Sequence, residues 1–139
     1  TKPVIMEAES SKIGGLHIPD AIWKAMLGAP CVKISTKIEA RVNHILAEYE
    51  HITTHTDALL RLVKGMINRH GHDITNDWKS LIADKDWSGL VRDLITQHYD
   101  PAYQGSSERR QRKAIGRIHL EKLDKPHIEN AAQEILALL

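Results

Sequence analysis

Residues 31–49 constrain the fold more than any other stretch, because they place a buried strand and an amphipathic helix in direct succession. The run Cys31-Val32-Lys33-Ile34 is typical of a strand. Thr36 and Glu39 then have the hydroxyl and carboxylate spacing of a helix capping box. The helix carries its apolar residues on one face, at Ile38, Val42, Ile45, Leu46 and Tyr49. A strand that leads directly into a helix predicts an α/β domain.

Two further strands are expected, one towards each end of the chain. The apolar run Val4-Ile5-Met6 predicts a buried strand that turns polar and breaks at Gly14-Gly15. Ile118 and Leu120 alternate with polar residues, which predicts a strand over residues 115–120.

The segments between these strands have the apolar periodicity of helices. A short apolar stripe before Gly28 and Pro30 predicts one helix. From residue 56 to about residue 98, three apolar stripes predict a helical insert or lid, the third of them capped by Asp86. We expect Pro101 to end this insert, because proline disfavours helix at the residue before it.

A final helix starts at Asp124 and Pro126, with its apolar side chains predicted to face inward. They are Ile128, Ala131, Ala132, Ile135, Leu136 and Leu139. The whole order predicts an α/β fold, a small, mostly parallel sheet of about three strands covered by helices, in one domain over residues 1–139 with its helical insert at about 56–98. A phosphate loop of the form G-x-x-x-x-G-K-[S/T] is absent from the sequence. The chain therefore resembles the later portion of a larger α/β domain.

Composition excludes some classes of function. The formal charge of +1 argues neither for nor against a nucleic-acid partner. The one cysteine, Cys31, rules out an intramolecular disulfide and fits a reducing compartment, so we expect a cytoplasmic protein. No apolar run approaches the roughly 20 residues of a membrane span, and we expect no membrane partner. His51 and His55 are spaced i, i+4 but lack a thiolate cluster, so no metal site is expected.

Two carboxylates are the candidate catalytic residues. Glu7 and Glu9 lie two apart at the end of the predicted opening strand, so they share a face at the edge where open α/β sheets bind ligands. One of them could orient a metal-bound water or a basic side chain. Alternatively, the two glutamates only end the strand and cap the turn at Ser10. Ser10 and Lys12 are candidate phosphate ligands, Lys12 being equally compatible with an ordinary solvated lysine.

Basic and aromatic side chains supply further candidates. Arg41, one turn into its helix, could bind a phosphate through two N–H groups or pair with an acidic neighbour on the same helix. A basic cluster in a predicted loop or frayed helix over residues 104–113 could hold RNA backbone or diphosphate, or be a solvated face. Its members are Arg109, Arg110, Arg112 and Lys113. Tyr103 could stack on an unpaired base, whereas for Tyr99 we favour packing and for Asp100 a role in fixing the turn at Pro101.

Three blocks of sequence resemble bacterial tRNA 2-selenouridine synthases. Glu7-Ala8-Glu9-Ser10-Ser11-Lys12-Ile13-Gly14 is similar to the family's E-x-E-S-x-x-I-G segment. Ile38-Glu39-Ala40-Arg41-Val42 is similar to its E-x-R-V helix start, and Tyr99-Asp100-Pro101-Ala102-Tyr103 to its YDPxY block. The blocks occur in the family's order across most of residues 3–105.

The resemblance implies part of a transferase that modifies tRNA at the wobble uridine. The family replaces the sulfur of 2-thiouridine with selenium from selenophosphate, through an S-geranylated intermediate made from geranyl diphosphate. These two compounds are co-substrates, and no cofactor is expected in this part. A rhodanese-like portion and a Walker-loop portion precede the matching region in the family. They would be partners of this chain together with tRNA, and the chain would be the later part of a P-loop NTPase-like domain that is inactive alone.

Two other functions fit the same residues. The chain could be a catalytically silent binding or scaffold module, which would have a protein partner but no ligand affinity. It could also be a fragment of a small-molecule P-loop kinase, which would transfer phosphoryl groups once joined to a Walker loop. Salt-dependent affinity for tRNA would favour the transferase over both.

Overall fold

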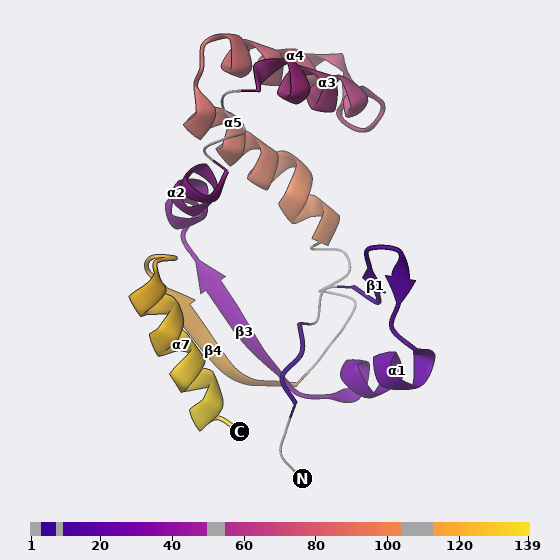
Figure 1. The fold of residues 1–139 in the computed structure, drawn as a ribbon, viewed down its shortest axis with the longest axis vertical. Coiled ribbons are helices and arrows are strands. Elements are labelled where there is room, and N and C mark those ends of the chain that lie inside the picture. Colours follow the sequence, from indigo (N-terminus) through magenta and orange to yellow (C-terminus); the bar gives the residue numbers. More distant parts are fainter. Residues whose placement is uncertain (1–3, 8–9, 50–54, 104–112) are drawn as a thin grey trace.

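A computed structural model describes residues 4–7, 10–49, 55–103 and 113–139, and in these parts helices predominate over short strands (Figure 1). In chain order the elements are β1 (Lys12–Ile13), β2 (Leu16–His17), α1 (Asp20–Gly28), β3 (Cys31–Thr36), α2 (Ile38–Glu48), α3 (Thr56–Gly65), α4 (Ile67–Ala83), α5 (Trp87–Asp93), the π-helix η2 (Leu94–Tyr99), β4 (Ala114–Leu120) and α7 (Lys125–Ala137). The predicted α/β class is confirmed.

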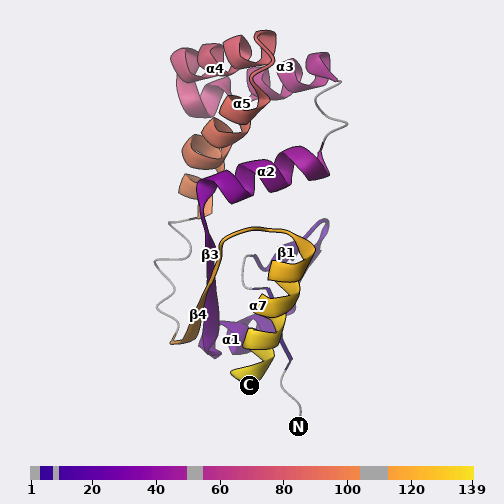
Figure 2. The ribbon, with the colours of Figure 1, turned by 90° about the vertical axis from the view of Figure 1, so that its left-hand side faces the viewer.

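The parallel sheet has two strands within the described residues, where about three were predicted. β3 and β4 pair in register from Val32 opposite Gly116 to Thr36 opposite Leu120. Helix α7 lies along one face of this pair, as the side view shows (Figure 2). Ile118, Leu120 and Ala131 form the buried core between helix and sheet.

The predicted opening strand is wrong over its described residues. Residues 4–7 have no strand conformation, and Val4 is 82% exposed. A strand needs a paired neighbour for its backbone N–H and C=O groups, and residues 4–7 belong to neither of the two described sheets. The chain instead forms the small antiparallel hairpin β1–β2, which turns at Gly14 with φ of 60°.

The predicted capping box is also wrong. Helix α2 begins after Lys37, and no side chain caps its first turn. The Thr36 hydroxyl donates to the backbone oxygen of Leu120 at 2.7 Å, because Thr36 is still paired with β4. The Glu39 carboxylate accepts from Arg92 of α5. Both side chains therefore connect elements that are distant in sequence.

The predicted helical insert is present as α3, α4, α5 and η2. Its core consists of Val63, Trp78, Ile82 and Leu90, all nearly inaccessible to solvent. Gly71, with φ of 81° and ψ of 176°, interrupts the helical path within α4. Asp86 caps α5 as predicted, accepting a hydrogen bond from the Gly89 backbone N–H.

Pro101 does not end the insert where the sequence predicts. Residues 94–99 form a π-helix, and residues 100–103 continue as helix. A proline ring collides with the carbonyl one turn earlier in an α-helix. The wider turn of η2 lies directly before Pro101 and relieves that collision.

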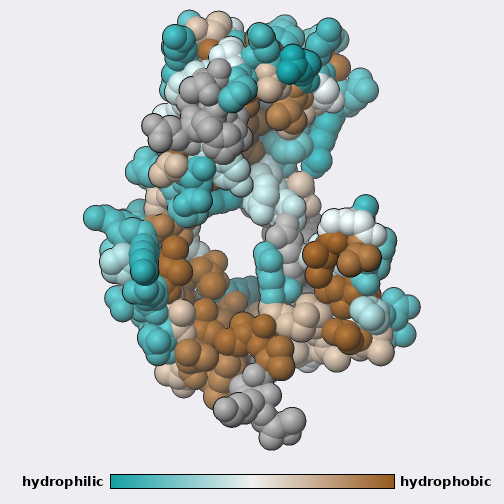
Figure 3. Space-filling view, in the orientation of Figure 1, coloured by the Kyte–Doolittle hydropathy of each residue, from teal (hydrophilic) through white to brown (hydrophobic). Residues whose placement is uncertain are grey.

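Helix α7 begins as predicted, with Asp124 accepting from the His127 backbone N–H. Its predicted inward face is only partly confirmed, because Ala131 is buried but Ile128, Leu136 and Leu139 are 45%, 55% and 54% exposed. Two strands are too narrow a surface to cover a whole helical stripe. Apolar side chains consequently gather around an opening between the sheet and the hairpin (Figure 3).

Candidate functional site

The side chains of Arg41 and Asp100 form a two-pronged ion pair between helix α2 and the end of the helical insert. Arg41 Nη1 donates to Asp100 Oδ2 at 2.9 Å, and Nη2 donates to Oδ1 at 2.7 Å. The two side chains are 27% and 31% exposed, so the pair is partly shielded from water. Hydrogen bonding to Asp100 raises the pKa of Arg41 above its ordinary value. Arg41 is therefore a fixed, permanently charged group.

Two tyrosines complete this arrangement. The Tyr99 ring centre lies 6.0 Å from the Arg41 guanidinium carbon, at the limit of a cation–π contact. The Tyr103 ring packs against Tyr99 with centroids 4.4 Å apart and planes inclined by 31°. Both rings remain exposed, at 45% and 38%. We call Arg41, Tyr99, Asp100 and Tyr103 the Arg41–Asp100 junction.

The junction contradicts one of the two interpretations of Arg41, namely that it pairs with an acidic neighbour on the same helix. Its acidic partner is not a neighbour on its own helix but lies 59 residues away. The sequence suggested that Asp100 fixes a turn at Pro101. This is wrong, because residues 100–103 are helical. A guanidinium has five N–H donors, and Asp100 occupies two nitrogens, so capacity for a phosphate oxygen remains.

An apolar pocket of about 240 Å³ lies farther along α2, between this helix, α3 and α5. Its lining residues are aliphatic or aromatic. They are Ile45, Leu46, Tyr49, Leu59, Trp87, Leu90, Val91 and Leu94. The volume is somewhat below the roughly 300–1,000 Å³ of typical small-molecule sites. The pocket therefore suits a short hydrocarbon chain.

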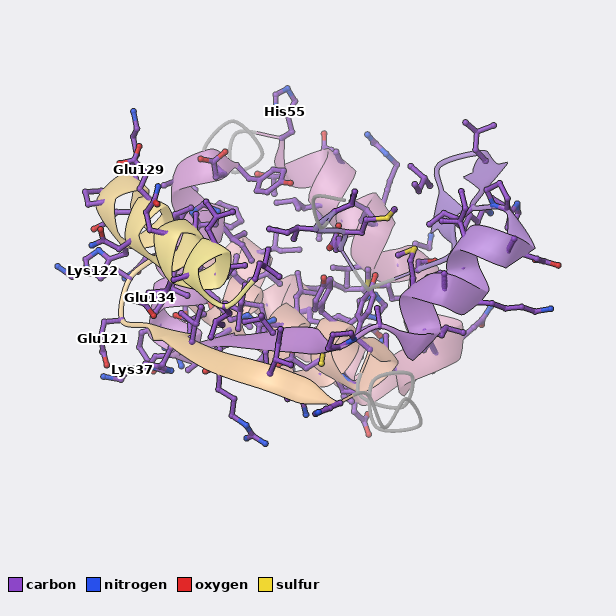
Figure 4. All side chains as sticks on the ribbon, turned by 90° about the horizontal axis from the view of Figure 1, so that it is seen from below. Lys37, His55, Glu121, Lys122, Glu129 and Glu134 are labelled. Atoms are coloured by element: carbon purple, nitrogen blue, oxygen red, sulfur yellow. The ribbon has the colours of Figure 1, made fainter. Side chains whose placement is uncertain are left out.

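Polar side chains meet at the carboxyl ends of β3 and β4 (Figure 4, which labels Lys37 and Glu121). Lys37 Nζ lies 2.7 Å from Glu121 Oε2, and Ser35 Oγ lies 3.1 Å from His119 Nδ1. The bond between Lys37 and Glu121 raises the pKa of the ammonium and lowers the pKa of the carboxyl. These contacts follow from the strand register, which places Ser35 opposite His119.

A histidine pair joins α4 to the π-helix. His70 Nε2 and His98 Nδ1 are 2.8 Å apart, so one ring donates to the other. The His70 ring also meets the buried Trp78 edge-on, with centroids 5.0 Å apart. Burial, with a smaller contribution from the charge of His98, lowers the pKa of His70.

The predicted acidic site and the Arg41–Asp100 junction belong to different segments of the chain. Glu7 is exposed on an irregular segment. Ser10 Oγ accepts from the Lys12 backbone N–H at 3.0 Å, and the Lys12 side chain is exposed. Glu9 lies outside the described residues. The roles assigned to these side chains stay predictions.

The basic cluster is described only at its last member. Lys113 is exposed, and its backbone oxygen accepts from the Cys31 N–H at 2.9 Å, so it directly precedes β4 beside β3. Arg109, Arg110 and Arg112 lie outside the described residues, as does His51. Within the described ranges, no group of three or more His, Cys, Asp or Glu side chains could hold a metal ion. None of the described helices is long and apolar enough to cross a membrane.

Comparison with known proteins indicates a class of protein through a family model and through two curated relatives. Residues 1–66 match a family model described as the tRNA 2-selenouridine synthase AAA domain. Two curated relatives then carry the name tRNA 2-selenouridine synthase. The protein from Shewanella sediminis is 24% identical over 82% of this chain, and that from Shewanella woodyi is 23% identical over 81%. The resemblance to bacterial tRNA 2-selenouridine synthases is thereby confirmed.

The chain spans 38% of the length of each of these two relatives. No solved structure matches the chain significantly. The family model covers the two blocks around Glu7 and Arg41, while the block around Asp100 lies beyond it. The ion pair between Arg41 and Asp100 joins the matched region to the rest of the chain.

Three sets of polar residues were missed by sequence reasoning: the Arg41–Asp100 partnership, the histidine pair and the polar group at the strand ends. The strand-end contacts could have been anticipated, because parallel pairing of the two predicted strands brings Ser35 near His119 once the register is known. No local pattern indicates the other two, since their partners are 59 and 28 residues apart.

Proposed function

We propose that this chain is part of a tRNA-modifying transferase that exchanges sulfur for selenium at wobble 2-thiouridine through a geranylated intermediate. Its own contribution is to bind tRNA and the diphosphate of geranyl diphosphate. Selenophosphate is the selenium donor, and the remaining catalytic groups come from rhodanese-like and Walker-loop portions. Such an enzyme works where tRNA is modified, in the cytoplasm.

The observation that carries this proposal is the junction itself. Two blocks that resemble the synthase family, one on α2 and one at residues 99–103, meet through a two-pronged ion pair. At the junction, a fixed cation lies beside two exposed aromatic rings. The apolar pocket uses the next turns of the same helices.

Arg41 and the apolar pocket match the two ends of a prenyl diphosphate. The cation suits the diphosphate, and the pocket suits the hydrocarbon chain. In the first step the thiocarbonyl sulfur of the uridine attacks carbon 1 of the geranyl group. The carbon–oxygen bond breaks, diphosphate leaves with the electron pair, and the N3 proton of the alkylated base passes to the released diphosphate or to water. Arg41, together with the basic cluster after Tyr103, would neutralise the leaving diphosphate, and the pocket would bury the hydrocarbon chain.

A fluorescence titration tests the proposal, because Trp87 lines the pocket. Geranyl diphosphate is added to the chain and tryptophan emission is recorded, with inorganic diphosphate and geraniol as partial ligands. We expect saturable quenching with geranyl diphosphate at concentrations at least tenfold lower than with either part. Trp87→Phe should remove most of the signal, whereas Trp23→Phe on α1 should keep it.

The competing functions predict other results. A silent scaffold shows no saturable change with any of the three compounds, which would overturn the proposed prenyl diphosphate site. Equal responses to geranyl diphosphate and geraniol would remove Arg41 and the basic cluster from the site. A binding assay with tRNA tests the remaining part of the proposal separately.

A further inference from the structure

The face of the β3–β4 sheet opposite α7 carries two cations, Lys33 and Arg117, that form no ion pair with a carboxylate of the described residues. Alternation along β3 places Lys33 and Ser35 on this face, and the register places Arg117 and His119 opposite them. The contact Ser35–His119 shows that these side chains share one side of the sheet. Lys33 and Arg117 are exposed.

Lys33 and Arg117 are direct partners in the strand register. Like charges directly opposite one another destabilise a sheet. The next pairs along the strands avoid this, since a hydroxyl faces an imidazole and then an ammonium faces a carboxylate. Among the described residues, no hydrogen bond or ion pair joins Lys33 or Arg117 to a carboxylate.

An anion placed between the two charges would offset their repulsion. Lys113, which is exposed and directly precedes β4, adds a third positive charge at the start of the same strand pair. The basic cluster in the sequence, from Arg109 to Lys113, leads directly into it. The open face is therefore joined by a short stretch of sequence to the basic cluster.

We propose that Lys33 and Arg117 form a phosphodiester-binding site that positions the backbone of the RNA substrate on the open face of the sheet. This inference rests on the proposed function, because it assigns a surface to the tRNA. An exposed strand face cannot enclose a small phosphate compound, but it can lie against a polyanion whose neighbouring phosphates contact several cations. Ser35 and His119 lie two residues farther along the strands and can donate to the adjoining phosphate or ribose.

The test is the salt dependence of tRNA binding. Fluorescence anisotropy of a labelled tRNA transcript is measured over a series of KCl concentrations for the unmodified chain and for Lys33→Gln/Arg117→Gln. The control is Arg61→Gln/Lys64→Gln, which removes the same two charge types from exposed positions on α3. Each lost phosphate contact lowers the slope of log affinity against log salt by about 1. We therefore expect the slope to fall by about 2 in the sheet variant and not in the control.

Two outcomes separate this inference from the proposed function. If the unmodified chain does not bind tRNA, the tRNA-binding function fails and the inference fails with it. If it binds and the two double variants have equal slopes, the inference alone is overturned. Inorganic diphosphate provides a second arm. Tight diphosphate binding that Lys33→Gln/Arg117→Gln abolishes, with tRNA affinity unchanged, would identify a small-anion site and overturn the assignment to RNA.

Thermal unfolding without ligand checks the premise of charge repulsion. At low salt Lys33→Gln/Arg117→Gln should have a higher Tm than the unmodified chain, and the difference should disappear at about 1 M salt, where the screening length is about 3 Å. A lower Tm at low salt would reveal an anionic partner within the chain and overturn the proposal. The same melting curves show that the variant is folded.

Discussion

At the scale of single residues, the Arg41–Asp100 pair combines geometry with partial burial in a way that the other ion pairs do not. Lys37–Glu121 is about 60% exposed on each side, and Arg92–Glu39 is 42% and 61% exposed. Exposed pairs contribute little, because water and salt screen them. The two-pronged bonds of Arg41 should therefore dominate the polar attachment of α2 to the insert.

Arg41→Gln is expected to lower the free energy of unfolding by about 2 kcal/mol, because it leaves the Asp100 carboxylate partly buried without its cation. The double variant Arg41→Gln/Asp100→Asn should recover part of this loss, giving a coupling energy of about 1 kcal/mol. Urea unfolding monitored by circular dichroism measures both values. Arg92→Gln is the matched control, and a loss as large as that of Arg41→Gln would contradict this ranking.

At the scale of elements, the sequence predicted what depends on local periodicity. The strand that begins at Cys31, the helix through Val42 and the Asp86 and Asp124 caps are each determined by residues within a few positions. Two of the errors share one cause, which is a partner far along the chain. Thr36 donates to the backbone oxygen of Leu120 instead of capping its helix, and Arg41 pairs with Asp100. The polar site could not be predicted for the same reason.

Gly71 divides α4 at a conformation that only glycine adopts readily, with φ of 81°. Gly71→Ala should destabilise the chain by about 1–2 kcal/mol, because the alanine is strained whatever space surrounds it. Gly65→Ala is the control. It lies at the end of α3 in open space without a positive φ, and should be neutral or slightly stabilising. Chemical denaturation compares them, and equal effects would show that Gly71 is not held in this conformation.

The link between α4 and η2 should weaken in acid. The pKa of His70 is below its ordinary value of 6.5 in the folded chain. The folded state therefore binds fewer protons than the unfolded state as the pH falls through that range, and stability falls with it. The lowered pKa values of Glu39, Glu121 and Asp124 act in the same direction at lower pH.

We expect Tm to decrease from pH 7.5 to pH 5.5, by a smaller amount in His70→Gln, whose amide can still bond to His98 but does not titrate. Differential scanning fluorimetry across this range measures the difference. His44→Gln on α2, away from the pair, is the control and should retain the full decrease. An unchanged profile in His70→Gln would exclude His70 as the responsible group.

At the scale of the whole molecule, two hydrophobic cores are separate. One lies in the helical insert around Trp78, and the other lies between α7 and the sheet around Ile118. Helix α2 connects them, since it follows β3 and packs on α5 (Figure 1). Hairpin β1–β2 has exposed side chains at every strand position and belongs to neither core.

Hydrogen exchange should resolve this division. Amides of α4 and α5 are expected to exchange more than about tenfold more slowly than those of β1 and β2, because local opening requires less energy where few apolar contacts are lost. The β3–β4 amides should fall between these groups. Mass spectrometry of peptic peptides measures the order. Uniform protection would show that the chain opens as one cooperative unit.

The pairing of β3 with β4 also affects how the chain folds. Ser35 and His119, which meet across the strands, are 84 residues apart in sequence. The helical insert between them has mostly local contacts, which form quickly, whereas closing a long loop is slow and entropically costly. The insert should therefore collapse first and shorten the distance between the strands. During synthesis β4 emerges only after the whole insert, so β3 would wait for its partner strand while the insert folds.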